Sequence, residues 1–115
     1  MPRRAVFIDH LTIVVRDLEA SRRFYEGALS PWSSHVVEYE PGVLGFGPAG
    51  SEDLALVQGE PTAPVHIAFA APDRETVERF HVAALSAGGR DNGGPGERPH
   101  YHPGYYAAYA LDPDR

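Results

Sequence analysis

Two histidines, His10 and His66, begin the two copies of an internal repeat. Residues 10–25 align with residues 66–81 at an offset of 56 without a gap, and five of the sixteen aligned residues are identical. The chain has no cysteine, so a bound metal must use histidine and carboxylate ligands. A single histidine on a strand is more often structural, but a matched pair favours a shared site. We therefore predict that His10 and His66 jointly bind one divalent ion, for which Zn, Ni, Fe and Mn are all suitable.

A second concentration of polar side chains lies at residues 98–103, with the sequence Arg98-Pro99-His100-Tyr101-His102-Pro103. His100 and His102 stand on alternate residues beside Arg98, which suits a metal ion or an anionic substrate; a solvated loop is the alternative interpretation. Five glycines between residues 88 and 96 precede this stretch and predict a mobile loop. We expect the loop at 88–103 to act as a lid that brings His100, Tyr101 and His102 to the metal site.

The elements that must position these residues have the same order in both copies. Each copy has an apolar run of strand length, then an aspartate suited to cap a helix (Asp17 or Asp73), and then a helical pattern of apolar residues. Successive side chains of a strand point to opposite faces, so His10 and Thr12 point away from the apolar face. If the helices cover that apolar face, His10 and His66 both lie on the opposite one.

Further strands are predicted after each helix. Residues 35–40, 43–46 and 54–57 are apolar or alternating and are separated by turn residues, and strand character returns at residues 105–111. We therefore predict one α+β domain, residues 1–115, made of two tandem βαβββ modules at 5–60 and 61–115. On this interpretation the last strand of the second module is absent from the sequence.

Composition argues against several classes of function. The net charge is −6, and the ten basic residues, all of them arginine, form no basic cluster, which argues against nucleic acid or an anionic membrane as a partner. No signal peptide or membrane-spanning run is recognisable, so we expect a cytoplasmic protein. Residues 45–50 satisfy the pattern G-x-G-x-x-G, but Pro48 and the lack of a following helix favour a turn between two strands over a nucleotide site.

Four stretches of the sequence carry a resemblance to a known family, namely residues 9–19, 23–25, 66–69 and 109–114. With a histidine on the first strand of each βαβββ module, the chain resembles the vicinal oxygen chelate superfamily, which includes glyoxalases, extradiol dioxygenases and the fosfomycin and bleomycin resistance proteins. The resemblance implies a curled mixed sheet that forms a cup, with helices on the outer face and both histidines as metal ligands inside. It also implies pairing of halves within or between chains, and with exposed strand edges we expect a homodimer.

The sequence departs from that family at two expected ligand positions. Arg115 stands where the closing motif of the family has a glycine, and the glutamate ligand expected about four residues later is absent. The acidic ligand that glyoxalase I carries in its first half would fall at Ala55. The lack of an acid there counts against a glyoxalase I with paired glutamates and leaves a His, His, Glu ligand set of the kind that extradiol dioxygenases use. Those enzymes also carry a tyrosine ten residues before their glutamate, which matches Tyr109, but their additional catalytic histidine has no counterpart.

Two functions from different classes remain open. The first is a glyoxalase- or dioxygenase-like metalloenzyme, a lyase or dioxygenase acting on a small oxygenated substrate, in which His102 or Tyr109 assists proton transfer. The second is a metal-free protein of the bleomycin-resistance type, whose acidic cup lined by aromatic side chains sequesters a cationic ligand. For the substrate or ligand we predict five binding residues: Thr12, Arg98, His100, Tyr101 and Tyr105.

Overall fold

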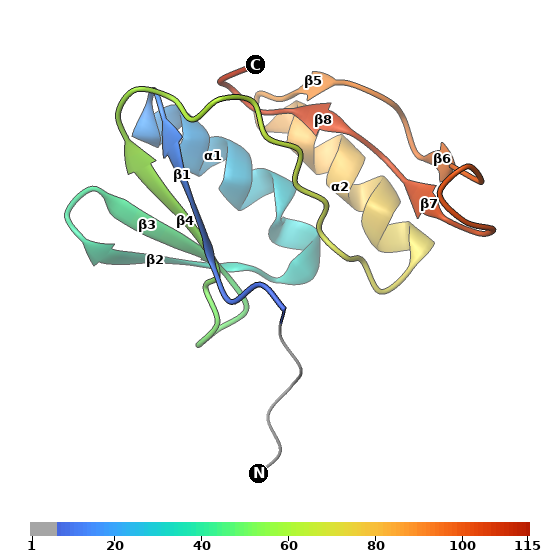
Figure 1. The fold of residues 1–115 in the computed structure, drawn as a ribbon, viewed down its shortest axis with the longest axis horizontal. Coiled ribbons are helices and arrows are strands. Elements are labelled where there is room, and N and C mark those ends of the chain that lie inside the picture. Colours follow the sequence, from blue (N-terminus) through green and yellow to red (C-terminus); the bar gives the residue numbers. More distant parts are fainter. Residues whose placement is uncertain (1–6) are drawn as a thin grey trace, which may run out of the picture.

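The computed structural model describes residues 7–115, and its first half is a βαβββ module (Figure 1). The four strands of this module form one sheet in the order β1-β4-β3-β2, with β1 parallel to β4 and the other neighbours antiparallel. The strands predicted in the first half are thereby confirmed. Their bounds, with the helices between them, are β1 (Leu11–Val15), α1 (Leu18–Ala28), the 3-10 helix η1 (Ser30–Trp32), β2 (His35–Glu40), β3 (Val43–Gly47) and β4 (Leu54–Gln58).

Both long helices begin at the predicted aspartates. The Asp17 carboxylate accepts a hydrogen bond from the Ala20 amide at 3.1 Å, and the Asp73 carboxylate accepts one from the Thr76 amide at 2.8 Å at the start of α2 (Arg74–Ser86). The Thr76 hydroxyl also donates to Asp73, and these two hydrogen bonds hold the pKa of Asp73 below its usual value. Each carboxylate satisfies an amide that would otherwise lack a partner in the first helical turn.

One face of the four-stranded sheet is buried against α1. Ile13 and Val15 of β1 and Leu56 of β4 have exposed fractions of 4%, 1% and 0%, and they pack with the apolar stripe of α1 in the same core. His10 and Thr12 are exposed, as the alternation of side chains along β1 predicts. The mixed α+β class and the open, curled sheet are therefore confirmed.

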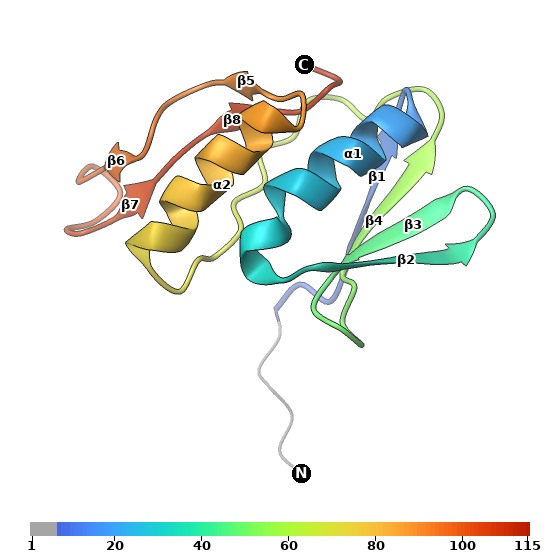
Figure 2. The same cartoon turned by 180° about the vertical axis from the view of Figure 1, so that it is seen from behind.

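The two helices lie side by side and join the two halves of the chain (Figure 2). A Cβ atom at Gly27 would lie 2.6 Å from the Cβ of Ala87, so only glycine at this position allows so close an approach. Ala84 of α2 is fully buried in the same core as the residues of α1. Neither helix within residues 7–115 is long and apolar enough to span a bilayer.

The second half has the predicted helix but much shorter strands. β5 (Arg90–Asp91) pairs with β8 (Ala110–Leu111), and β6 (Gly96–Glu97) pairs with β7 (Tyr106–Ala107), both antiparallel. The strand predicted at 105–111 is thus present as two short pieces, and the loop predicted at 88–103 contains β5 and β6. Two backbone hydrogen bonds bridge the pieces: the Tyr109 amide donates to the Gly93 carbonyl, and the Asn92 amide donates to the Tyr109 carbonyl.

The apolar run around His66, which was predicted as the first strand of the second module, lies in a segment, residues 63–71, that does not form a strand. Within residues 7–115 this segment makes no backbone-to-backbone hydrogen bond. Its Ala70 carbonyl instead accepts a hydrogen bond from the Trp32 indole at 2.8 Å. A strand requires a neighbour that pairs with its amides and carbonyls. The described residues place no strand beside 63–71, and the tandem repetition of the module is therefore incomplete.

Candidate functional site

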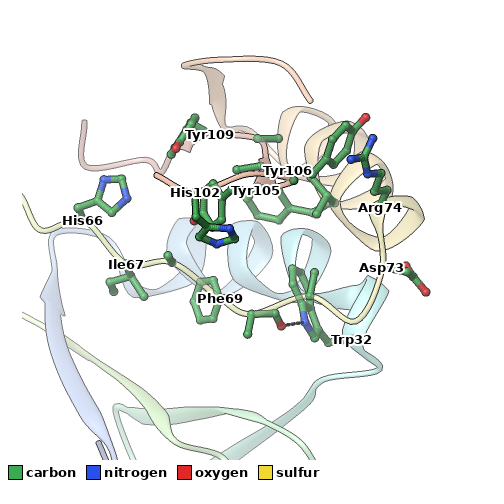
Figure 3. Close-up of a pocket in the computed structure, with 18 residues that line it drawn as sticks. Trp32, His66, Ile67, Phe69, Asp73, Arg74, His102, Tyr105, Tyr106 and Tyr109 are labelled. Carbon is green, nitrogen blue, oxygen red and sulfur yellow. Dashed lines mark hydrogen bonds between the residues drawn. The ribbon is translucent and has the colours of Figure 1, made fainter. Parts of the chain in front are cut away.

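Seven of the nine site residues predicted from the sequence lie together in the second half of the chain. They come from three separate segments: residues 63–71, the connection between β6 and β7, and the connection between β7 and β8. Figure 3 labels His66, His102, Tyr105 and Tyr109 among them. We name this group the aromatic-histidine cluster, and its members are His66, Arg98, His100, Tyr101, His102, Tyr105 and Tyr109.

Tyr109 joins segment 63–71 to the rest of the cluster. The centre of its ring lies 5.8 Å from that of the His66 ring, and the Arg98 guanidinium carbon lies 5.2 Å from the ring centre as a cation–π contact. Burial, followed by the neighbouring hydroxyls of Tyr101 and Tyr105, raises the pKa of Tyr109. The phenol therefore stays protonated into alkaline solution and remains a hydrogen-bond donor.

The other half of the cluster is built around Tyr105. Its ring centre lies 4.9 Å from that of Tyr101 and 5.0 Å from that of His102, and the His100 ring lies 4.6 Å from that of Tyr101. Two backbone turns fold the connection between β6 and β7 back on itself. In the first the Tyr101 amide donates to the Arg98 carbonyl, and in the second the Tyr105 amide donates to the His102 carbonyl. The imidazoles of His100 and His102 lie on this exposed tip.

The glycines predicted to loosen the loop also make room for Arg98. The Arg98 guanidinium donates to the Gly94 carbonyl at 2.9 Å, and a Cβ at Gly96 would lie 3.0 Å from its Nη1 atom. A Cβ at Gly93 would lie 3.1 Å from the Tyr109 ring, and the φ of Gly93 is +136°, which side chains rarely adopt. Glycine at 93 and 96 therefore allows Arg98 to pack on Tyr109. A motion of this loop as a lid is not tested by the structure and stays a prediction.

Two hollows separate residues 63–71 from the strands β7 and β8. The first, of about 510 Å³, is bounded by residues 66–71 and 104–109, with Val77 and Phe80 of α2 and the η1 residue Trp32 among its walls (Figure 3). The second, of about 360 Å³, continues along the same two segments toward α1 and Arg115. Both hollows share His66, Ile67 and Tyr109, so together they form one slot between the two segments.

The remaining two predicted site residues, His10 and Thr12, lie in the first half of the chain. His10 is exposed, and its Nδ1 atom lies 3.1 Å from the Asp9 carboxylate. Thr12 is opposite Ala55 in the pairing of β1 with β4, so the position at which glyoxalase I would carry an acid holds a methyl group. Within residues 7–115, no three histidine or acidic side chains are arranged to bind one metal ion. Joint binding by His10 and His66 stays a prediction.

Several residues beside the cluster were not predicted as functional. The Arg74 guanidinium lies 4.5 Å from the ring centre of Tyr106, whose hydroxyl donates to Glu78 at 2.8 Å and thereby has a raised pKa. Trp32 lies at one end of the slot with its ring 6.1 Å from that of Phe69. Trp32 is the only tryptophan of the chain, and this was the one sequence feature that could have marked it as functional. Nothing in the sequence linked it to residues 69 or 106.

His81, which the sequence predicts to be structural, joins α2 to β5. Its Nε2 atom lies 2.9 Å from the Asp91 carboxylate, and its side chain is largely buried. Hydrogen bonds from the Gly93 amide and then from His81 lower the pKa of Asp91. This contact fixes β5, and with it the start of the loop that carries the cluster.

The sequence profile of the Glyoxalase/Bleomycin resistance protein/Dioxygenase superfamily matches residues 7–115. The chain belongs to this superfamily. The resemblance of the repeat and of the closing 109–114 stretch to these proteins is thereby confirmed. A search of curated proteins found no match.

Solved structures of this superfamily have the same fold. A glyoxalase/bleomycin resistance protein from Albidiferax ferrireducens T118 is 26% identical, with a TM-score of 0.69 over 92% of this chain and 89% of the other. A family enzyme from Burkholderia phytofirmans PsJN is 22% identical, with a TM-score of 0.72 over 96% and 93% of the two chains. A glyoxalase-related enzyme from Fulvimarina pelagi is also 22% identical, with a TM-score of 0.71 over 94% and 81%. The last two similarities concern the fold alone.

Proposed function

We propose that this superfamily member binds a small, planar, oxygen-bearing molecule at the aromatic-histidine cluster. The observation that carries the proposal is the composition of the cluster, which combines three imidazoles and a guanidinium with three phenol rings and contains no carboxylate. Glu97 precedes Arg98 in the sequence, but its carboxylate forms an ion pair with the Arg74 guanidinium, at 3.7 Å. The cluster therefore suits oxygen atoms of partial or full negative charge better than the cationic ligand that the net charge of the chain favours.

Each part of the cluster has a role that follows from its chemistry. The rings of Tyr101, Tyr105 and Tyr109 offer faces and edges on which a flat molecule can pack. The Arg98 guanidinium donates to the Gly94 carbonyl at 2.9 Å and to the Glu97 carbonyl at 3.5 Å, and a guanidinium has five donors, so donors remain for a carboxylate or phenolate oxygen. The His102 imidazole is exposed and has its Nδ1 atom 3.1 Å from the Pro103 carbonyl, so its other ring nitrogen can form a hydrogen bond with a ligand.

A metal-assisted lyase or dioxygenase is the second candidate function. The observation that favours it is that His10 and His66 are both exposed and occupy equivalent positions of the repeat. Among residues 7–115, neither histidine belongs to a group of three side chains that could hold a metal ion.

The first candidate is tested by calorimetric titration with 3,4-dihydroxybenzoate, which carries an aromatic ring, two adjacent hydroxyls and a carboxylate. We expect the double variant His100→Ala, His102→Ala to bind at least tenfold more weakly than the wild type. Its free energy of unfolding should change by less than about 0.5 kcal/mol, because both residues are on the surface. The matched control is His35→Ala, an exposed histidine outside the cluster, which should bind normally. Equal affinity in all three proteins contradicts the proposal.

The second candidate is tested by elemental analysis of the purified protein and by titration with Zn, Ni, Fe and Mn salts. Stoichiometric metal that is lost in both His10→Ala and His66→Ala supports a shared site. Full metal occupancy in both single variants would rule that site out.

A further inference from the structure

The contact between His81 and Asp91 leads to the Tyr109 side of the aromatic-histidine cluster. The Asp91 Oδ1 atom accepts two hydrogen bonds, one from His81 Nε2 at 2.9 Å and one from the Gly93 amide at 3.0 Å. The Asp91 side chain is 61% exposed, whereas the His81 side chain is only 13% exposed. Holding an exposed side chain in one rotamer costs conformational entropy, so the imidazole is the group that keeps the carboxylate against the Gly93 amide.

Gly93 in turn supports two members of the cluster at once. Its carbonyl accepts a hydrogen bond from the Tyr109 amide at 2.8 Å, and the amide of its neighbour Asn92 donates to the Tyr109 carbonyl at 3.0 Å. A Cβ atom at Gly93 would lie 3.1 Å from the Tyr109 ring and 3.3 Å from Arg98 Nη2, so the Gly93 backbone lies against both groups of the cation–π contact. A shift of Gly93 would therefore move the Tyr109 ring relative to the Arg98 guanidinium.

Few other contacts hold this part of the loop. The pairing of β5 with β8 ends at Asp91, and strand pairing begins again at Gly96. Within residues 7–115, residues 94 and 95 make no backbone-to-backbone hydrogen bond, and there is open space around Gly94. The Asp91 carboxylate therefore supplies the partner of the Gly93 amide in an otherwise sparsely bonded turn, and His81 connects that carboxylate to a helix of the core.

We propose that His81 is a positioning residue for the aromatic-histidine cluster. Through Asp91 it fixes the turn at Gly93, and this turn holds Tyr109 and Arg98 in the arrangement that binds the ligand. His81 lies outside the cluster and is not among the residues that line the two hollows, so it acts without touching the ligand. This role rests on the proposed function and extends it, because a group fixed before binding loses less conformational entropy when the ligand binds.

The test uses the full chain and begins with three variants on helix α2. His81→Leu removes the N–H group that contacts Asp91, and His81→Gln keeps an N–H donor on a side chain of similar reach. Glu78→Ala is the matched control, since it removes a different hydrogen bond between α2 and the strands, the one that the Tyr106 hydroxyl donates at 2.8 Å.

The first measurement is amide hydrogen exchange by NMR without ligand. In His81→Leu we expect the Gly93 and Tyr109 amides to exchange at least tenfold faster than in the wild type. The amide of Leu56, in the central strand β4, should exchange at the wild-type rate, which separates a local release of the turn from global unfolding. His81→Gln should return the Gly93 and Tyr109 amides close to the wild-type rates, and Glu78→Ala should leave them unchanged.

The second measurement is the affinity for 3,4-dihydroxybenzoate by calorimetric titration. We expect His81→Leu and Asp91→Ala each to bind at least tenfold more weakly than the wild type, and His81→Gln and Glu78→Ala to bind normally. Because His81 acts through Asp91, the double variant should bind no more weakly than Asp91→Ala alone. Asp91 is largely exposed, so Asp91→Ala provides the same exchange and affinity measurements if His81→Leu does not fold.

Three results overturn the role of His81. They are wild-type exchange of the Gly93 and Tyr109 amides when the contact is broken, no recovery in His81→Gln, and additive losses of affinity in the double variant. If the wild type binds 3,4-dihydroxybenzoate, these results contradict the role of His81 alone. Absence of binding by the wild type contradicts the proposed function, and the role of His81 in it as well.

Discussion

Replacement of Tyr25 by phenylalanine removes one hydroxyl that ties α1 to the end of the chain. The Tyr25 side chain is 6% exposed, and its hydroxyl donates to the Asp112 carboxylate at 2.7 Å. The ring itself packs edge-on against Phe24 with centres 4.9 Å apart and also contacts Phe46. Tyr25→Phe preserves these ring contacts, so the change in stability reports on the hydrogen bond.

A hydrogen bond to a charged group contributes about 1.5–3 kcal/mol. Asp112 is only half-buried, so water can solvate its free oxygen in the variant, and the loss should fall near the lower limit, about 1.5–2 kcal/mol. The free energy of unfolding is measured by urea denaturation followed by circular dichroism, and an unchanged m-value shows that the denatured state is unchanged. Tyr39→Phe is the matched control, since the Tyr39 side chain is 56% exposed, and it should show no measurable loss.

The same pair of residues predicts a dependence on alkaline pH. Burial, and then the charge of Asp112, raise the pKa of Tyr25 above its usual value near 10. The folded state therefore retains the phenol proton when the unfolded state has lost it. This contribution to stability is complete below pH 10 and is lost as the pH rises beyond it. The variant should lose less stability than the wild type between pH 10 and 11. Equal stability of Tyr25→Phe and the wild type at pH 7 would refute the reasoning.

Four further predictions concern the core, the loop and the assembly. Leu56→Ala removes a side chain with no exposed surface and should destabilise the fold by about 2–5 kcal/mol, measured by urea denaturation. Gly93→Ala should destabilise by about 1–3 kcal/mol because of its positive φ and the nearby Tyr109 ring, whereas Gly94→Ala, with open space around it, should not; similar losses in both would contradict this. Hydrogen bonds from the Gly93 amide and from His81 lower the pKa of Asp91 in the folded state, so the contribution of this carboxylate to stability is complete above about pH 4 and is lost as the pH falls below it. Asp91→Asn should therefore make the free energy of unfolding depend less on pH in this acidic range. Sedimentation should show a homodimer, and a stable monomer at micromolar concentration would contradict that expectation.

The fold of the first half and the helix α2 could be predicted because their signals are local. Asp17 and Asp73 precede helical patterns and cap the helices, and alternation along β1 places His10 and Thr12 on the exposed face. The second half could not be predicted to the same extent. Whether residues 63–71 form a strand depends on a neighbouring strand, and that neighbour is not determined by the segment itself.

The sequence selected residues that lie together, but it did not predict their geometry, and their role as a site stays a prediction. The polar and aromatic residues between 98 and 109 were predicted to contribute to a site because of their residue types. In the structure they lie together with His66. The contact of Arg98 with Tyr109 depends on the space left at Gly93 and Gly96, and the Tyr25 contact with Asp112 joins residues far apart in sequence. Such contacts follow from tertiary packing, which periodicity and spacing do not encode.

The most direct test of the central claim is to observe the side chains of the aromatic-histidine cluster during addition of 3,4-dihydroxybenzoate. NMR spectra of ¹³C-labelled histidine and tyrosine rings resolve each ring separately, and His35, His81 and Tyr39 serve as internal controls outside the cluster. We predict saturable shifts for His66, His102, Tyr105 and Tyr109 that fit one dissociation constant, with the three control rings unchanged. Shifts confined to the control rings, or no saturable shift in the cluster at millimolar ligand, would contradict the assignment of this cluster as the binding site.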